Sequence, residues 1–249
     1  MLKITLKFAF CNIVMFFVAV NFFYAQKSTE VKKACDVANM RLQNVKIEAQ
    51  SIERLFTKLS LSYDIPIGLE VATNDDELAT YSIDFKEGNL SDLLNQIIRD
   101  NSQYDWEIKD GVVNVFPKAG HRVLFFRELL ETKISHFSIK EKTNCWLFVE
   151  NLIATPEVKN ILEINSINYS KRSFTGFYIP QLGENFVMNV SDSSLKSILN
   201  KVIKESPTAK IWLIKRYSHD PQTFFITVNA RHSDFPMKNG EPSFPKIDF

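Results

Sequence analysis

Glycine is scarce in this chain, with only seven among 249 residues. The loops that hold nucleotide phosphates need several closely spaced glycines, because the backbone must come close to the phosphate group. Neither the Walker pattern nor the dinucleotide-binding G-x-G-x-x-G pattern occurs in the sequence. We therefore predict no nucleotide site and no bound cofactor.

Cysteine and histidine are also few, with three cysteines and four histidines. The histidines are His121, His136, His219 and His232, and no two of them have the spacing of metal ligands. A cysteine nucleophile needs a histidine beside it, but Cys145 falls on an apolar helical stripe, where a thiol is inert. The sequence therefore predicts no metal site and no catalytic residue, so we do not expect an enzyme.

The chain also lacks an excess of charge of either sign. Thirty lysines and arginines face twenty-nine aspartates and glutamates, which leaves a formal net charge of +1. A strong positive field is what attracts a protein to nucleic acid or to anionic lipid. We therefore predict no nucleic-acid binding.

One long apolar run is present, at the start of the chain. Two lysines lie within residues 1–7, an almost wholly apolar run covers 8–24, and a polar stretch follows Ala25. This order is typical of a secretory signal peptide, here residues 1–25, and it predicts a periplasmic or extracellular protein. Phe23 is bulky for the small-residue position before the cut. An uncleaved inner-membrane anchor over residues 8–25 is therefore the alternative, and without it we expect no membrane insertion.

Export would leave Cys35 and Cys145 in the mature chain. An oxidising compartment permits a disulfide between them. A buried free thiol at Cys145 is the alternative, because this residue shares a helical stripe with apolar side chains. Sequence alone leaves both outcomes open, since a disulfide depends on the distance between the two residues.

The clearest pattern is an internal repeat. The order of features over residues 82–116 returns over 187–228: a strand, a polar cap, a helix and then a hairpin with one tryptophan, Trp106 or Trp212. The two helices carry the same apolar spacing, Leu90, Leu93, Leu94, Ile97 and Ile98 in the first copy and Leu195, Ile198, Leu199, Val202 and Ile203 in the second. Two unrelated α+β segments are the alternative, because any amphipathic helix has this spacing.

We divide the chain accordingly into two units of the α+β class, each a small βαββαββ-type domain with two helices packed on short sheets. The first unit is residues 45–118, and its closing hairpin turns at Asp110-Gly111, a dipeptide preferred in two-residue turns. Within the second unit we expect a strand over 161–167. The predicted segments are 26–44, a polar tether; 45–118, the first unit; 119–134, a connector; 135–229, the second unit with an insertion at 169–184; and 230–249, a disordered tail.

The first unit resembles the secretin and TonB-receptor short N-terminal domain, and the second unit resembles it more weakly. The likeness rests on an apolar pattern over 45–49, the helix from Ser51, the segment 82–94 with its paired Leu93-Leu94, and the closing hairpin. The resemblance implies an extracytoplasmic docking module with two helices on small sheets. No receptor or secretin barrel follows in this sequence, so a receptor's signalling role is not carried over.

These observations predict a non-catalytic module that binds another protein of the bacterial envelope through sheet edges or exposed loops. Aromatic residues outside the predicted cores are the candidate partner-binding residues: Phe174, Phe177 and Tyr178 in the insertion, and Phe235, Phe244 and Phe249 in the tail. A small-molecule or glycan site in the cleft between the units is the alternative. That site would be lined by aromatics such as Phe125, Phe126 or Tyr178.

Overall fold

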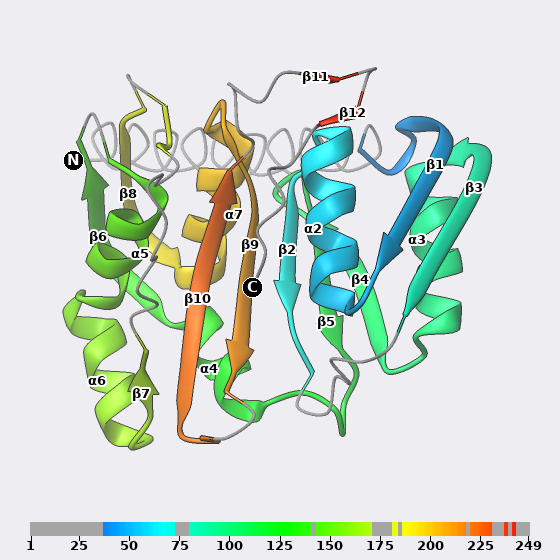
Figure 1. Ribbon diagram of the computed structural model, residues 1–249. Coiled ribbons are helices and arrows are strands. Elements are labelled where there is room, and N and C mark those ends of the chain that lie inside the picture. The colour runs from blue at the N-terminus through cyan, green and yellow to red at the C-terminus, as the bar shows by residue number, and fades with distance from the viewer. Residues whose placement is uncertain are drawn as a thin grey trace, which may run out of the picture.

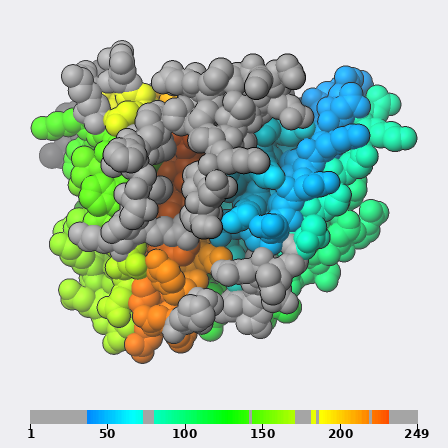
Figure 2. Space-filling view, in the orientation of Figure 1, coloured from blue at the N-terminus to red at the C-terminus, as the bar shows by residue number. Residues whose placement is uncertain are grey.

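The computed structural model describes residues 37–72, 80–140, 143–170, 181–183, 186–217 and 220–230, together with the backbone of 237–238 and 241–242. Helices and strands are mixed along the chain, which confirms the predicted α+β class. Figure 1 shows a central sheet with helix α2 in front of it and helix α7 behind. The space-filling view shows the first unit, in blue and cyan, directly beside the second unit, in green and orange (Figure 2).

The first unit forms the expected seven elements. Ser51 caps the first helix by accepting a hydrogen bond from the Arg54 N–H, and Asn89 and Asp92 form a capping box at the second. Asp110 and Gly111 both have positive φ, as the tight hairpin turn requires. The elements are β1 (Arg41–Ala49), α2 (Ile52–Tyr63), β2 (Ile67–Glu70), β3 (Tyr81–Asn89), α3 (Leu90–Asp100), β4 (Tyr104–Lys109) and β5 (Val112–Pro117).

The second unit follows the same order with one added helix, and a further helix precedes it. Its elements are α4 (Leu124–Glu131), β6 (Lys133–Ile139), α5 (Cys145–Ile153), α6 (Pro156–Ile164), β7 (Asn168–Tyr169), β8 (Met188–Ser194), α7 (Leu195–Glu205), β9 (Ala209–Arg216) and β10 (Thr223–Ala230). The predicted strand over 161–167 is wrong, because a helix occupies most of it. Pro156 stands in the first turn of that helix, and Val158 and Leu162 give it an apolar stripe.

Two predicted boundaries also change. Strand β1 begins at Arg41, so the last residues of the predicted tether belong to the fold. In the predicted disordered tail, β11 (Met237–Lys238) pairs with β12 (Glu241–Pro242) in antiparallel fashion. The sequence between these strands is Asn-Gly, another dipeptide preferred in hairpin turns.

Strand pairing follows one scheme in both units. In the first, β1 pairs with β3, and a second sheet has the order β4-β5-β2 with β2 parallel to β5. In the second, β6 pairs with β8, and the order is β9-β10-β7 with β7 parallel to β10. The repeat seen in the sequence therefore extends to the pairing of the strands.

The two three-stranded sheets are not separate, which corrects the expectation of two units that each close their own sheets. Strand β2 pairs in parallel with β9, so one six-stranded sheet runs through both units in the order β4-β5-β2-β9-β10-β7. All four residues of β2 are buried, as in a strand with neighbours on both sides. Its Gly68 also lets the Trp212 side chain lie against the strand.

The second unit is turned over relative to the first. Strands β5, β2 and β9 run in one direction, and β4, β10 and β7 run in the other. The equivalent strands β4 and β9 are therefore antiparallel to each other. This inversion places the helices of the two units on opposite faces of the shared sheet (Figure 1).

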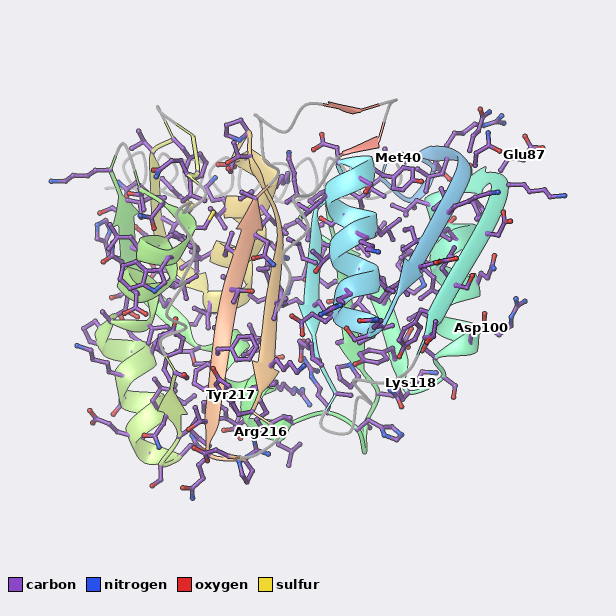
Figure 3. All side chains as sticks on the ribbon, viewed as in Figure 1. Met40, Glu87, Asp100, Lys118, Arg216 and Tyr217 are labelled. Carbon is purple, nitrogen blue, oxygen red and sulfur yellow. The ribbon has the colours of Figure 1, made fainter. Side chains whose placement is uncertain are left out.

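Each face of the sheet has its own core, and each core takes residues from both units. On one face, Ile211 and Leu213 of β9 pack with the residues of α2 and α3 in the first core. On the other face, Trp212 and Ile214 pack with α5 and α7, and Val112 of the first unit joins this second core. Side chains fill the space between α2 and the sheet (Figure 3). The units therefore share their hydrophobic interior.

The connector between the units is largely helical and belongs to the second core. Phe125 and Phe126 of α4 lie on Phe224, with ring centroids 5.6 and 6.1 Å away. Both α4 rings are buried. They therefore do not line a cleft between the units, contrary to what the small-molecule alternative requires.

Candidate functional site

The aromatic residues predicted to bind a partner all lie outside the described residues. They are Phe174, Phe177, Tyr178, Phe235, Phe244 and Phe249. Their role in binding stays a prediction.

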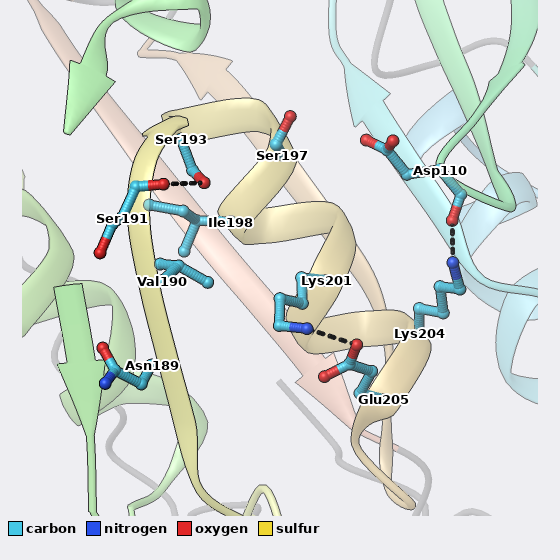
Figure 4. A pocket seen from close by; sticks show the side chains of 10 residues that line it. All are labelled: Asp110, Asn189, Val190, Ser191, Ser193, Ser197, Ile198, Lys201, Lys204 and Glu205. Carbon is cyan, nitrogen blue, oxygen red and sulfur yellow. Dashed lines mark hydrogen bonds and ion pairs between the residues drawn. The ribbon is translucent and has the colours of Figure 1, made fainter. Parts of the chain in front are cut away.

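A groove of about 500 Å³ lies between the units on the side of α7. Figure 4 shows its walls, which are β8, α7 and the β4–β5 turn. The lining residues are Asp110, Asn189, Val190, Ser191, Ser193, Ser197, Ile198, Lys201, Lys204 and Glu205. The first unit contributes only Asp110 at the turn, and the other residues come from the second unit.

One wall of this groove is the edge of strand β8. The lining includes three successive residues, Asn189, Val190 and Ser191, whose side chains alternate between the two faces of the strand. No residue of β6 lines the groove, although β6 is the neighbour of β8. Among the described residues no other strand pairs with β8. The groove therefore runs along the edge of β8 that β6 leaves open.

Helix α7 forms the opposite wall and carries two lysines into the groove. Lys201 forms an ion pair with Glu205 one turn further along, and Lys204 donates a hydrogen bond to the backbone carbonyl of Asp110. The second contact ties the hairpin of the first unit to α7 (Figure 4). The lining has both signs of charge together with hydroxyl groups, which suits hydrogen bonding more than tight apolar binding.

The side chain of Asp110 leaves one buried oxygen without a protein hydrogen-bond partner, its Oδ2 atom. This oxygen is enclosed by the protein, so it is not exposed to a molecule in the groove. The groove thus offers a strand edge on one side and the lysines of α7 on the other.

A second hollow, of about 280 Å³, lies beside the face of β4 and β5 that points towards α4. At its base the Arg122 guanidinium donates two hydrogen bonds to the Glu70 carboxylate, at 2.8 and 2.6 Å. Glu70 is almost fully buried. Burial raises the pKa of the Glu70 carboxyl, and the contact with Arg122 opposes that rise. The Phe116 ring lies within 6 Å of both Arg122 and Lys196. We interpret the contact between Arg122 and Glu70 as a structural ion pair that joins β2 to the connector, and not as a binding site.

A matching hydrogen bond occurs in both units. The indole N–H of Trp106 donates to Asn95 on α3 at 3.1 Å, and that of Trp212 donates to Asn200 on α7 at 2.8 Å. Neither asparagine was singled out from the sequence. Each is the sixth residue of its helix, so aligning the two copies on their caps would have found them. This detail extends the repeat to the level of side chains.

Cys145 is buried and has no disulfide partner among the described residues, and burial raises the pKa of its thiol to about 12. A thiol in this setting is protonated at neutral pH and unreactive. Its predicted disulfide partner, Cys35, lies outside the described residues, so the disulfide stays a prediction.

The described residues contain neither a metal-binding cluster nor a membrane-spanning helix. No group of three or more histidine, cysteine, aspartate or glutamate side chains lies close enough there to hold a metal ion. No helix in this part of the chain has the length and apolar character needed to cross a membrane. The groove beside β8 is therefore the best-defined candidate site on the described surface.

Comparisons of the chain with protein-family models, with curated proteins and with solved structures found no match.

Proposed function

We propose that the chain is an exported, non-catalytic interaction module of the bacterial periplasm or envelope, which binds an extended segment of another envelope protein along β8. The observation that carries this proposal is the open edge of β8 facing a groove. An open edge presents unpaired backbone donors and acceptors, which readily accept a partner strand.

The groove can distinguish between partner segments through its side chains. A half-buried Val190 beside the buried Ile198 offers a shallow apolar contact, while Ser191 and Ser193 offer hydroxyl groups. In such complexes the backbone supplies most of the affinity, and alternate side chains supply the selectivity.

Two features of the sequence support an extracytoplasmic role. The order of charge and apolarity over residues 1–25 is that of a signal peptide. The resemblance of residues 45–118 to the secretin and TonB-receptor short N-terminal domain implies a docking module outside the cytoplasm. An inner-membrane anchor over 8–25 would keep the module on the same side of the membrane.

The proposal can be tested with a photo-crosslinking residue at Asn189 in the groove and, as a control, at the exposed Lys159 on α6. In the native envelope we expect an adduct with a protein partner from the first position and none from the second. Adding Ser191→Lys and Ser193→Lys should suppress the adduct, because charges on an edge oppose strand pairing. The matched pair His136→Lys and Ser138→Lys on β6 should leave it unchanged. Equal adduct yields in both double variants would contradict the proposal.

A small-molecule or glycan ligand is the second candidate for the same groove. Its support is the polar lining, in which Asn189, Ser191 and Ser197 offer amide and hydroxyl groups to a sugar. The aromatic lining expected for such a ligand is not found at Phe125 and Phe126, which are buried. Titration with a soluble peptidoglycan fragment, followed by NMR shifts of groove residues, separates the two candidates.

A further inference from the structure

The two units are joined by the pairing of β2 with β9, in which a strand of the first unit is added to the edge of a sheet in the second. Strand β2 lies in parallel beside β9, and Gly68 is the residue directly opposite Trp212. A Cβ atom placed on Gly68 would lie only 2.4 Å from the indole ring. The indole thus leans over the neighbouring strand, and only glycine fits beneath it.

The hydrogen bond to helix α7 keeps the indole in this position. Trp212 donates its N–H to Asn200, and both side chains are buried. Strand β2 can therefore pair beside β9 because three residues fit together: Trp212, the Asn200 that holds its indole, and the Gly68 that lies opposite. We call this set the tryptophan–asparagine–glycine arrangement.

Strand β4 has the same tryptophan and asparagine, but no described strand lies beside its outer edge to supply the glycine. It occupies in the first unit the place that β9 occupies in the second, and its Trp106 donates to Asn95 in the same way. Strand β4 stands at the end of the sheet order, and no described strand pairs with its outer edge. Trp106 is accordingly half-buried, whereas Trp212 is 1% exposed.

On the open edge of β4, the backbone N–H of Trp106 has a hydrogen-bond acceptor within its own strand. The backbone N–H of Trp106 donates to the carboxylate of its own neighbour Asp105, at 2.8 Å, instead of to a strand. A side chain can leave such a bond when a backbone carbonyl arrives. This donor is therefore satisfied in the free protein and can still pair with a partner strand.

The two residues that flank Trp106 on β4 indicate which charge a partner strand should carry. In the internal joint, Ile67 and Leu69 of the added strand lie beside Ile211 and Leu213. On β4 the two positions flanking Trp106 hold Asp105 and Glu107, both exposed. Lys196 forms an ion pair with Glu107 at 2.9 Å, which leaves the Glu107 side chain 48% exposed, and the Asp105 carboxylate accepts the Trp106 N–H. An added strand would place its own flanking residues against these carboxylates, which favour basic side chains.

We propose that β4 is a second docking edge, which accepts in parallel an extended segment of another protein with a glycine opposite Trp106 and a basic residue on each side of that glycine. This inference rests on the proposed function and adds a second, chemically defined partner segment to it. The edge of β4 is distinct from the groove beside β8, so the two sites can be tested separately.

The probe is a short, end-capped, dye-labelled peptide with the order Val-Lys-Gly-Lys-Val flanked by threonines, titrated with the mature chain and followed by fluorescence anisotropy. We expect saturable binding. Replacing the central glycine by valine should abolish it, because the indole occupies that space. Asp105→Lys with Glu107→Lys should weaken binding by about tenfold, since two favourable charge pairs become unfavourable. The same variant should favour a peptide with glutamates in place of the lysines.

Several outcomes would overturn this inference. Saturable binding that is unchanged by the glycine replacement or by the charge reversal would show that Trp106 and its neighbours do not select the segment. An absence of binding would do the same, as would self-association of the chain that the charge reversal removes, since β4 would then pair with a second copy.

The two docking edges are separated by crossed controls. Ser191→Lys with Ser193→Lys should leave the peptide affinity unchanged, and Asp105→Lys with Glu107→Lys should leave the adduct at Asn189 unchanged. In the unmodified chain, an adduct at Asn189 without any peptide binding would reject the β4 edge alone. Peptide binding without any adduct at Asn189 would reject the groove beside β8 alone.

Discussion

At the scale of single residues, the fold depends on a few polar groups placed inside it. Glu70 is a buried carboxylate within the central sheet, and the Arg122 guanidinium forms an ion pair with it at 2.6 Å. Removing one member of a buried pair leaves an uncompensated charge, which costs more than the pair contributes. The hydrophobic pattern of β2 predicted a strand, but it gave no sign of the partner 52 residues away.

Replacing Arg122 by alanine should lower the free energy of unfolding at neutral pH by about 2–4 kcal/mol, because Glu70 loses its counterion. The pKa of Glu70 is already raised by burial, and it should rise further in the variant. A carboxyl whose pKa is higher in the folded state contributes stability at low pH that is lost as the pH rises through that value. The deficit of the variant should therefore shrink towards about pH 4.

Urea titrations of both proteins across this pH range provide the measurement. The control is the same substitution in a Glu70→Gln background, where the difference between Glu70→Gln and the double variant Arg122→Ala with Glu70→Gln should not depend on pH. A deficit of equal size at all pH values in the single variant would mean that Arg122 acts by packing on Phe116 instead.

At the scale of elements, the sequence predicted most helices and strands but not their neighbours. Caps such as Ser51, the Asp110-Gly111 turn and the apolar spacing of α3 and α7 are local signals, so they could be read directly. The pairing of β2 with β9 joins residues far apart in the chain, and no local pattern specifies it. The groove beside β8 was missed for the same reason, because it forms only when the two units are assembled.

Strand β2 gives a prediction at this scale. Gly68→Ala should destabilise the protein by about 1–3 kcal/mol, because the new methyl group meets the indole of Trp212 and one of them must move. The same substitution should cost less in a Trp212→Phe background, where the smaller ring leaves room. A double-mutant cycle from chemical denaturation measures this coupling. Additive effects would show that the close approach does not constrain the joint.

At the scale of the whole molecule, the shared sheet makes the two units one folding unit. Residues of β9 and β10, including Ile211, Leu213 and Phe225, complete the core of the first unit. The boundaries suggested by the repeat are therefore boundaries of structural copies and not of separate cores. Tyr217 near the end of β9 lies against Phe225 on this same face, with ring centroids 5.3 Å apart (Figure 3).

We expect the mature chain to unfold in a single transition, with far-ultraviolet circular dichroism and tryptophan fluorescence giving the same midpoint. A truncated chain of residues 26–118 should show no cooperative transition, because it lacks the β9 and β10 side chains that cover its core. Urea unfolding of both chains is the measurement. Two separate transitions in the full chain, or cooperative unfolding of the truncated one, would contradict a common core.

The inverted placement of the second unit also bears on how the two copies can diverge. Ile211 and Leu213 belong to the later copy, yet the side chains they contact are those of the earlier one. A substitution at either position must therefore suit the side chains of both copies. We expect the residues buried at this joint to tolerate fewer substitutions than those on the outward strand edges.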